Sequence, residues 1–340
     1  MNAPSHQSTV SERLRTTWRS RGPAAWCLLP VAGIYALLTC LHKTLYRSGI
    51  KKAQHPGVPV IVIGNVIAGG AGKTPTTLAT VAHLKNKGLK VGIISRGFGR
   101  TPTDCREVHP HSRPQDVGDE PLLLAQHSGV PVFVAPERFI AAQALLEFYA
   151  NTDVIVCDDG LQHCALARDI EVCVFNDEEI GNGWMLPAGP LREPWPRRVN
   201  AVLYSAPTPP QGTPPTTPCF PIKRQLATYA LRSTGERVQL SDLQSEPLHA
   251  VAAIARPEDF FAMLRAQSLH IVSTEALPDH YNFESWQQPS GIAKHVICTE
   301  KDATKLWQTH PNALAVPLQI HVDQGYFDLL DKQLCLSSTP

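Results

Sequence analysis

The stretch Asn65-Val66-Ile67-Ala68-Gly69-Gly70-Ala71-Gly72-Lys73-Thr74-Pro75 decides the fold of this 340-residue chain. An apolar run from Val58 to Gly64 precedes it and is typical of a buried strand. A helical pattern from about Thr76 to Lys87 follows it. A strand, a glycine-rich loop, a Lys-Thr pair and a helix, in that order, predict a phosphate-binding P-loop.

The predicted loop has the chemistry of a triphosphate site. Its backbone N–H groups can turn around an anion, and the helix N-terminus adds partial positive charge. Lys73 can reach the β- and γ-phosphates, and Thr74 can ligate Mg²⁺. Ile67 stands where the motif has its first glycine, so a glycine-rich loop that binds no phosphate is the alternative. The predicted nucleotide-binding residues are Gly69, Gly70, Ala71, Gly72, Lys73, Thr74 and Pro75.

Composition excludes several functional classes. The net charge is +1 and charged residues make up 18 % of the chain, so we expect no nucleic-acid partner. The nine cysteines form no Cys-x-x-Cys pair, which is typical of reduced thiols in the cytosol. No His-x-x-x-His spacing occurs within a helical pattern, and we expect no structural zinc.

The segment from Ala24 to Leu41 carries no charge, and basic residues flank it on both sides. Its 18 residues are at the short limit for crossing a bilayer. A cleaved signal peptide is disfavoured because no small-x-small site follows. A buried core helix is one alternative. A membrane anchor or interfacial helix is favoured, because basic flanks suit an anionic cytoplasmic leaflet. Charge does not decide between a helix that spans and one that lies flat.

Strands and helices alternate from Val58 onward, which predicts an α/β fold with a parallel, P-loop NTPase-like sheet and a second, smaller α/β domain. The six prolines within residues 206–218 favour a stiff linker. The predicted units are an N-terminal segment, 1–52, with its membrane-associated helix at about 24–41; a P-loop core, 53–205; a Pro-rich linker, 206–221; and a C-terminal domain, 222–340.

Two acidic pairs follow predicted strands or turns. Asp158 and Asp159 come directly after four apolar residues. Sites form at the carboxyl ends of parallel strands, so these acids predict a Mg²⁺ site beside the P-loop, with helix capping as the alternative. Asp119 and Glu120 precede Pro121 at the start of a helical pattern. Capping and a catalytic base are equally compatible with that position.

Other loops are less specific when taken alone. Ser95 to Arg100 has two arginines on a glycine-rich turn that suits an anionic ligand. Met185 to Pro194 suits a surface that meets acyl chains and phosphate, or a plain surface loop. A lone His280 is more often structural than catalytic. Thr299 to Asp302 is adequate as a helix cap without any chemistry.

Taken together, these segments resemble one family, the tetraacyldisaccharide 4′-kinases, or lipid A 4′-kinases (LpxK family), of Gram-negative bacteria. The matching segments extend in one order from Gly64 to Leu306. They are GNVIAGGAGKTP, SRGFGR, VGDEP, ERFIAA, DDGLQH, LPAGPLREP, ARPEDFF, PDHYNF and CTEKDATKL.

The resemblance implies a lipid kinase of lipopolysaccharide biosynthesis. Such an enzyme transfers the γ-phosphate of ATP to the 4′-hydroxyl of tetraacyldisaccharide 1-phosphate, a tetraacylated glucosamine disaccharide, and forms lipid IVA. It implies ATP and Mg²⁺ as cofactors and work on the lipid surface at the cytoplasmic face of the inner membrane. We expect no obligate protein partner. A membrane-tethered P-loop ATPase acting on a protein partner is the alternative function.

The resemblance also implies roles for particular residues. Asp119 resembles the catalytic base, His280 its partner, and Lys73 acts with them on the phosphate. Thr74, Asp158 and Asp159 resemble the metal site. The implied substrate or transition-state residues are Glu120, Arg138, Gln162 and Arg192. Ile67 and Ala71 stand where the family often has threonine, so any contact made by those threonines is missing here.

Overall fold

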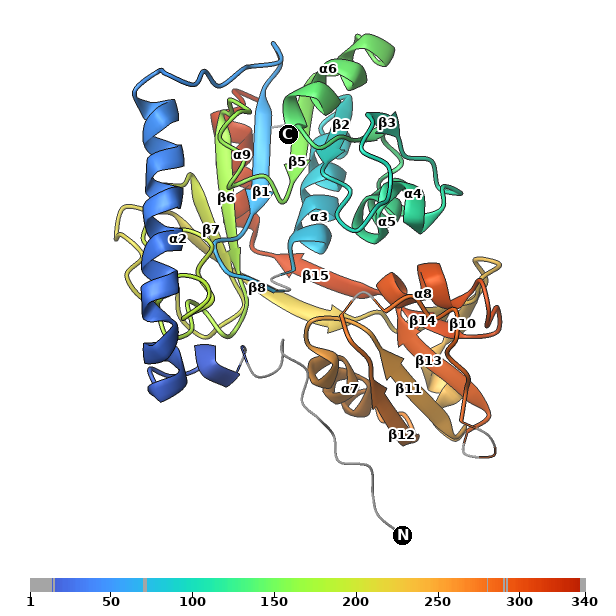
Figure 1. Cartoon of the computed structure of the whole chain (residues 1–340). Coiled ribbons are helices and arrows are strands. Elements are labelled where there is room, and N and C mark those ends of the chain that lie inside the picture. The colour runs from blue at the N-terminus through green and yellow to red at the C-terminus, as the bar shows by residue number, and fades with distance from the viewer. Residues whose placement is uncertain are drawn as a thin grey trace.

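The computed structural model describes residues 14, 16–69, 72–279, 281–289, 291 and 293–336. These residues form two α/β bodies and one long N-terminal helix that stands beside the larger body (Figure 1). The larger body contains the P-loop segment, and the smaller body faces the N-terminal end of the helix that follows the loop (Figure 1).

The larger body is built on a nine-stranded sheet with the order β15-β8-β7-β6-β1-β5-β2-β4-β3. The strands from β8 to β4 in that order run parallel, and β15 and β3 pair antiparallel at the two edges. Every residue of β1, β2 and β5 is buried, as expected for apolar strands covered on both faces. The bounds are β1 Val60–Gly64, β2 Val91–Ser95, β3 Arg106–Glu107, β4 Val132–Val134, β5 Val154–Asp158, β6 Ile170–Phe175, β7 Ala201–Tyr204, β8 Cys219–Leu226 and β15 Leu318–Val322.

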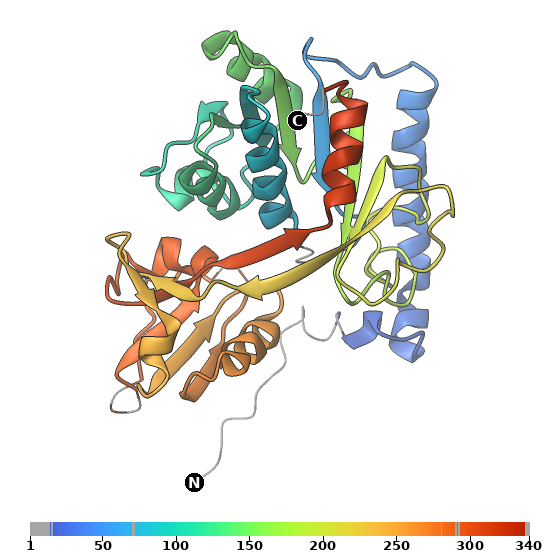
Figure 2. The same ribbon diagram turned by 180° about the vertical axis from the view of Figure 1, so that it is seen from behind.

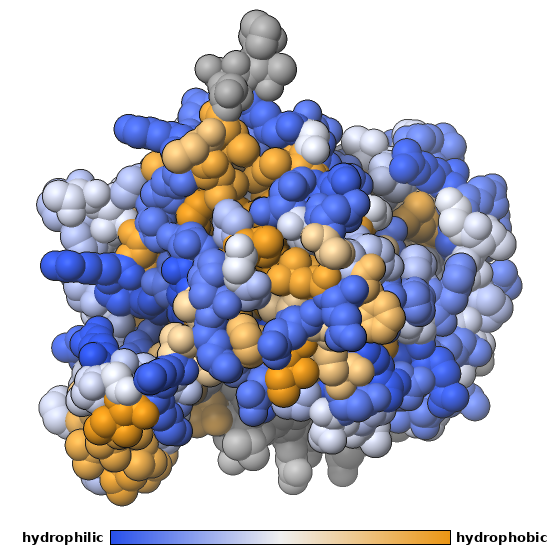
Figure 3. Space-filling view, turned by 90° about the horizontal axis from the view of Figure 1, so that it is seen from above, coloured by the Kyte–Doolittle hydropathy of each residue, from blue (hydrophilic) through white to orange (hydrophobic). Residues whose placement is uncertain are grey.

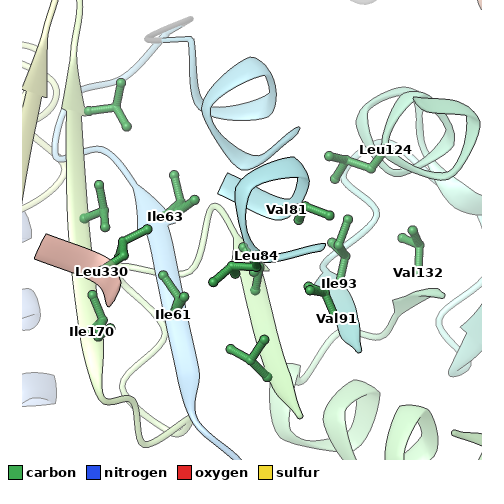
Figure 4. Packing of buried hydrophobic residues seen from close by; sticks show 14 of the residues in the cluster. Ile61, Ile63, Val81, Leu84, Val91, Ile93, Leu124, Val132, Ile170 and Leu330 are labelled. Atoms are coloured by element: carbon green, nitrogen blue, oxygen red, sulfur yellow. The ribbon is translucent and has the colours of Figure 1, made fainter. Parts of the chain in front are cut away.

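Helices cover both faces of this sheet. On one face, α3 (Lys73–Asn86), α5 (Asp119–Ser128) and α9 (Gln324–Gln333) share an apolar cluster with the strands. Figure 4 shows residues of α3, α5 and α9 lying over residues of β1, β2 and β6 in this cluster. On the other face, α6 (Arg138–Phe148) packs through Ala141, Ala142 and Leu145. A short helix, α4 (Pro114–Val117), leads into α5.

The last segment of the chain returns to the larger body. β15 pairs with β8 over five residues, and the two strands form the ribbon that joins the two bodies (Figure 2). In α9, Tyr326 and Leu330 are fully buried, and the Tyr326 hydroxyl lies 2.8 Å from that of Thr80 in α3. The structure therefore differs from the predicted division, in which 222–340 formed one domain, because local patterns do not reveal which sheet a strand joins.

The proline-rich segment also has a different place. Residues 206–218 connect β7 to β8, which are neighbours in the same sheet. The predicted linker at 206–221 is therefore a loop within the larger body that ends in the first residues of β8. The β8–β15 ribbon crosses between the bodies instead.

The smaller body has a six-stranded sheet with the order β10-β9-β14-β13-β11-β12. β11 to β14 run parallel, and β9 and β10 are antiparallel at one edge. This arrangement, together with the larger sheet, confirms the predicted α/β class with a second, smaller α/β unit. The bounds are β9 Tyr229–Leu231, β10 Arg237–Gln239, η1 Leu240–Leu243, β11 Leu248–Ala252, α7 Pro257–Ala266, β12 Ile271–Ala276, β13 His295–Thr299, α8 Glu300–Leu306 and β14 Leu314–Val316.

The uncharged N-terminal segment forms α2 (Pro23–Arg47), which begins with Pro23 at its first turn and continues through Pro30. Only Ala25 and Ala32 of this helix are buried. Its most apolar 18-residue window has a mean hydropathy of 1.9 and is 11 % buried, so the helix is long and apolar enough to cross a membrane by composition. This exposure disfavours the core-helix alternative.

Candidate active site

The P-loop segment leaves the buried end of β1 and enters α3 at Lys73. Gly72 adopts φ 82°, a left-handed conformation that favours glycine, directly before that helix. Asn65 is fully buried and holds both ends of the loop. Its Nδ2 donates to the carbonyl of Gly69 at 3.3 Å, and its Oδ1 accepts from Lys73 Nζ at 3.3 Å. The lysine that the sequence assigned to phosphate is therefore already directed at the loop. Gly70 and Ala71 lie outside the described residues.

Asp158 ends β5 beside the P-loop strand, in register with Ile63 of β1. Its Oδ1 accepts from Thr77 Oγ1 at 2.8 Å, so the bonded hydroxyl comes from one helical turn beyond Thr74. Its buried Oδ2 has no hydrogen-bond partner within the described part of the chain. Burial, together with the negative charges of Glu120 and Asp159, raises the pKa of Asp158 to about 7.

Asp159 is held by cations. It adopts φ 48°, and its carboxylate accepts from Arg192 Nη1 at 3.3 and 3.2 Å. Lys73 Nζ lies 3.6 Å from its Oδ1. Burial acts to raise the pKa of Asp159, but Lys73, Arg192 and Arg138 outweigh it and hold the pKa below its usual value. Arg138 is 5 % exposed and donates from Nη2 to the Asp159 carbonyl at 3.0 Å. Arg138 therefore fixes the backbone at Asp159.

Asp119 and Glu120 form the first turn of α5 and meet α8 of the smaller body. Asp119 is 6 % exposed, and its Oδ2 lies 2.7 Å from Lys305 Nζ. Glu120 Oε1 lies 3.6 Å from Lys301 Nζ, which is also 4.0 Å from Asp279 Oδ1. His280 lies outside the described residues, but the residue before it thus lies at the same interface between the two bodies.

A tight backbone contact joins the Ser95–Arg100 turn to the start of α5. Gly118 adopts φ 93°, and a Cβ added there would lie 2.9 Å from the carbonyl oxygen of Phe98. Only glycine fits this approach without displacing the backbone. Two of the sequence motifs, SRGFGR and VGDEP, are therefore one packed unit behind Asp119.

Gln162 connects the P-loop to the LREP segment. Its Nε2 donates to the Asn65 carbonyl at 2.8 Å and to Glu193 Oε1 at 2.6 Å. The Glu193 side chain is fully buried and also accepts from Arg197 Nη1 at 3.1 Å on both oxygens. The structure thus brings Lys73, Asp158, Asp159, Gln162 and Arg192 into one contiguous cluster at the carboxyl ends of β1 and β5.

A cavity of about 240 Å³ adjoins the other side of the P-loop. Its wall includes Ile67 and Gly69 of the loop, Asn176 after β6, and Arg256 of the smaller body. Arg256 is fixed there by two hydrogen bonds to Asp177, at 2.5 and 2.8 Å. The cavity is therefore bounded by both bodies, on the side of β1 opposite to Asp158.

Comparison with known proteins gives one consistent family. The family model for tetraacyldisaccharide-1-P 4′-kinase matches residues 24–335. The tetraacyldisaccharide 4′-kinase of Acidovorax sp. (strain JS42) is 56 % identical over 339 residues, which cover 100 % of this chain and 99 % of the relative. The chain belongs to the tetraacyldisaccharide-1-P 4′-kinase family.

More distant members agree. The tetraacyldisaccharide 4′-kinase of Herminiimonas arsenicoxydans is 39 % identical over 351 aligned positions, covering 96 % of this chain and 97 % of the relative. A crystal structure of LpxK from Aquifex aeolicus, described as an "apo" form in complex with ATP, matches with a TM-score of 0.78 at 26 % identity, covering 92 % of this chain and 99 % of that one. These matches confirm the family and the fold class, and they do not favour the membrane-tethered ATPase.

The oxygen groups around the P-loop suit a hard divalent cation. Asp158 Oδ2 is a buried carboxylate oxygen without a hydrogen-bond partner among the described residues, and Mg²⁺ prefers such ligands. Within the described ranges, no three or more His, Cys, Asp or Glu side chains are arranged so that they could hold a metal ion by themselves. A Mg²⁺ ion here would therefore take few protein ligands, as Mg²⁺ does when it is bound together with substrate phosphates.

Asn65 and Glu193 escaped the sequence-based selection. Asn65 stands at the start of the P-loop stretch, and Glu193 follows Arg192 in the LREP segment. Their positions within the matching segments were the available signal. Their partners, Lys73 for Asn65 and Gln162 for Glu193, become visible only in three dimensions.

Proposed function

We propose that this chain transfers the γ-phosphate of ATP to the 4′-hydroxyl of tetraacyldisaccharide 1-phosphate and so forms lipid IVA. One observation carries the proposal. In a member of this kinase family, Lys73, the Asp158–Asp159 pair and Asp119 all lie where the larger body faces the smaller one. A phosphate donor at the P-loop and an acceptor between the two bodies would then meet in one place.

On the donor side, Lys73 and Arg192 stabilise negative charge. Both cations contact Asp159. Because Lys73 directly follows the phosphate-binding loop, Arg192 is held beside that loop as well. Phosphoryl transfer spreads charge over the equatorial oxygens, and catalysis consists mainly of positioning and neutralising that charge. Asp159 thus holds Lys73 and Arg192 in place until a triphosphate competes for them.

On the acceptor side, Asp119 accepts the proton of the 4′-hydroxyl, with His280 as its partner. A sugar hydroxyl is a weak nucleophile, and a positioned carboxylate raises its reactivity. Lys305 contacts the Asp119 carboxylate at 2.7 Å and orients it toward the space between the bodies. Glu120, in the same turn of α5 as Asp119, pairs with Lys301 of α8 and so links the two bodies.

Mg²⁺ would be held by Thr74 and Asp158 and would neutralise phosphate charge when bound. Asp158 Oδ2 has no hydrogen-bond partner in the described part of the chain, and Thr77 fixes the direction of Oδ1. Asp159 completes the acidic pair but is engaged with Lys73 and Arg192, so we assign it to orienting these cations as well as to the metal site.

The nucleoside would occupy the cavity beside Ile67 and Arg256. In open parallel sheets, ligands bind outside the carboxyl ends of the strands. The acidic pair takes the β5 side of the P-loop strand, which leaves the β6 side for the nucleoside. The cavity lies there, next to Asn176 and Glu178.

The long N-terminal helix would place the enzyme on the cytoplasmic face of the inner membrane. Six large apolar residues on it are between 53 and 68 % exposed, and they are Trp26, Val31, Ile34, Leu37, Leu38 and Leu41. Figure 3 shows this apolar mass projecting at one side of the molecule, seen along the helix. The substrate is an acylated lipid, so a membrane-facing helix delivers the site to the surface where the substrate lies.

The test is a lipid kinase assay. Purified protein is given ATP, Mg²⁺ and tetraacyldisaccharide 1-phosphate in mixed micelles, and the lipid products are separated. We expect a bisphosphorylated lipid whose formation requires all three components. ATP turnover that is indifferent to the glycolipid, with no labelled lipid, would refute the proposal.

A further inference from the structure

The N-terminal segment of the chain is attached to one loop, residues 182–193. Trp18 Nε1 donates to the Pro187 carbonyl at 2.9 Å, and the Trp26 ring meets the Trp184 ring edge-on with centroids 5.1 Å apart. Arg21 Nε donates to the carbonyl of Asn182 at 3.1 Å. The first turn of α2 and the residues just before it therefore pack on this loop.

The far end of the same loop pairs with the P-loop. Ala68 N–H donates to the Pro190 carbonyl at 2.8 Å, and Arg192 N–H donates to the Val66 carbonyl at 2.7 Å. Ile67 and Leu191 form an antiparallel bridge between these two hydrogen bonds. A displacement of residues 190–193 would therefore move the P-loop backbone directly.

Two polar side chains of α2 reach this paired segment. The Tyr35 hydroxyl donates to the carbonyl of Arg192 at 2.9 Å. Lys43, about two turns nearer the C-terminal end of the helix, forms an ion pair with Glu193 Oε2. The side chain of Lys43 is 22 % exposed and that of Glu193 is fully buried. Lys43 therefore lies between the Glu193 carboxylate and the solvent.

A chain of hydrogen bonds connects the Lys43–Glu193 pair to Lys73 of the P-loop. Glu193 Oε1 accepts from Gln162, and Gln162 donates to the Asn65 carbonyl. Asn65 Oδ1 in turn accepts from Lys73 Nζ at 3.3 Å. Among the described residues, Glu193 pairs with two cations, Lys43 and Arg197, and Arg197 also pairs with Glu171. Removing Lys43 would therefore leave the buried carboxylate with a shared cation, and the groups around it would have to rearrange. Here the groups that would rearrange are those that hold the P-loop.

We propose that Lys43 and Tyr35 are positioning residues for phosphoryl transfer. They act through Glu193 and Arg192, so α2 is a structural part of the phosphate site as well as its membrane-facing element. Turnover then depends on how this helix is seated. The inference rests on the proposed kinase function, and it assigns to the helix a role that anchoring alone does not require.

The test compares Lys43→Met, Lys43→Arg and Lys52→Met. Methionine keeps the apolar stem of the lysine and removes its charge, and Lys52 is an exposed cation just beyond the same helix. In mixed micelles, we expect Lys43→Met to lower kcat by about 10- to 100-fold, the range that small misplacements of reacting groups produce. The KM for the lipid and the membrane partition should change little, whereas the Tm should fall because the buried Glu193 loses one of its partners. Lys43→Arg should regain most of the turnover, and Lys52→Met should match the wild type.

A double-mutant cycle with Glu193→Gln separates positioning from general damage. If Lys43 acts through the Glu193 carboxylate, Lys43→Met should cost little further turnover in the Glu193→Gln background. Near-normal kcat in Lys43→Met, or an equal loss in both backgrounds, would overturn the inference.

A variant that does not fold and a wild-type protein without activity lead to different conclusions. If Lys43→Met does not fold, Tyr35→Phe decides, because it removes one hydroxyl and nothing else. We expect kcat to fall by about 3- to 10-fold in that variant, in line with one lost hydrogen bond, and unchanged kcat would overturn the inference. A wild-type protein without lipid kinase activity would refute the proposed function instead.

Discussion

Replacing Thr299 by alanine should destabilise the smaller body more at pH 8 than at pH 5. Thr299 is the N-cap of α8, where its Oγ1 accepts from the Asp302 N–H at 3.1 Å and donates to Asp302 Oδ2 at 2.6 Å. Ala253 N–H donates to the same carboxylate oxygen at 3.0 Å. Asp302 is 4 % exposed, so these donors replace water around its charge.

The direction of the pH effect follows from the titration of Asp302. Burial raises its pKa from 3.8 to about 6, against the opposing effect of its hydrogen bonds to Thr299 and Ala253. The folded carboxyl therefore keeps its proton over a range in which the unfolded one has lost it. Its contribution to stability is most favourable below the unfolded pKa and falls as pH rises through the folded pKa. At 1.36 kcal/mol per pKa unit, the loss is about 3 kcal/mol by pH 7.

The magnitude for Thr299→Ala has two parts. Loss of the cap costs about 1 kcal/mol at either pH. Loss of a hydrogen bond to a charged acceptor adds about 1.5 to 3 kcal/mol, but only where Asp302 is ionised. We therefore expect about 1 kcal/mol at pH 5 and about 2.5 to 4 kcal/mol at pH 8.

Urea unfolding at the two pH values, followed by the fluorescence of Trp286 and Trp307 in the smaller body, measures this difference. Thr299→Ser keeps the hydroxyl and is the matched control, with a loss below about 1 kcal/mol at both pH values. Equal losses for Thr299→Ala at pH 5 and pH 8, or equal losses for the serine and alanine variants, would refute the reasoning.

Four further outcomes are expected. Asp119→Ala and His280→Ala should each lower kcat far more than they weaken ATP binding. Turnover assays measure the first effect and isothermal titration the second. Near-normal turnover in His280→Ala would show that His280 is not the partner of the Asp119 base. Lys73→Ala should abolish the ATP-dependent rise in Tm, and an undiminished rise would mean that ATP binds elsewhere. Deleting residues 1–45 should release the protein from membranes or impair its solubility, and unchanged sedimentation with vesicles would contradict the membrane role of α2. Asp177→Asn should weaken the contact between the two bodies at pH 7, and its effect should diminish as the pH falls far enough to protonate Asp177 in the folded protein. An arginine of the smaller body holds the pKa of Asp177 below its usual value, so the stabilisation is present above the unfolded pKa and lost as pH falls; a pH-independent effect in limited proteolysis would contradict this.

Local sequence patterns were sufficient for the elements that form the phosphate site. The apolar run before the glycine-rich loop is β1, and the run before Asp158 is β5. Both are buried on two faces, so their side chains need not alternate and the runs are continuous. The capping reading of Thr299 to Asp302 is confirmed by the hydrogen bond to Thr299 Oγ1, because a cap is formed by residues three apart in sequence.

The same patterns failed where an element is defined by a distant partner. β15 resembles any short strand, and only its pairing with β8 shows that it belongs to the larger body. Residues 206–218 contain the prolines of a linker, but β7 and β8 on either side of them pair in parallel. A high proline content indicates that a segment is locally stiff. Which domain the segment belongs to depends instead on which surfaces become buried together.

The sequence by itself indicated a P-loop, an acidic pair after an apolar strand and an uncharged apolar helix, because each is a short-range pattern of backbone or side-chain chemistry. Only the tertiary structure decided that Lys43 of that helix pairs with the buried Glu193, and that Asp119 meets Lys305 across two bodies. Those contacts join residues 150 and 186 positions apart. They depend on the packing of whole elements, which no local pattern encodes.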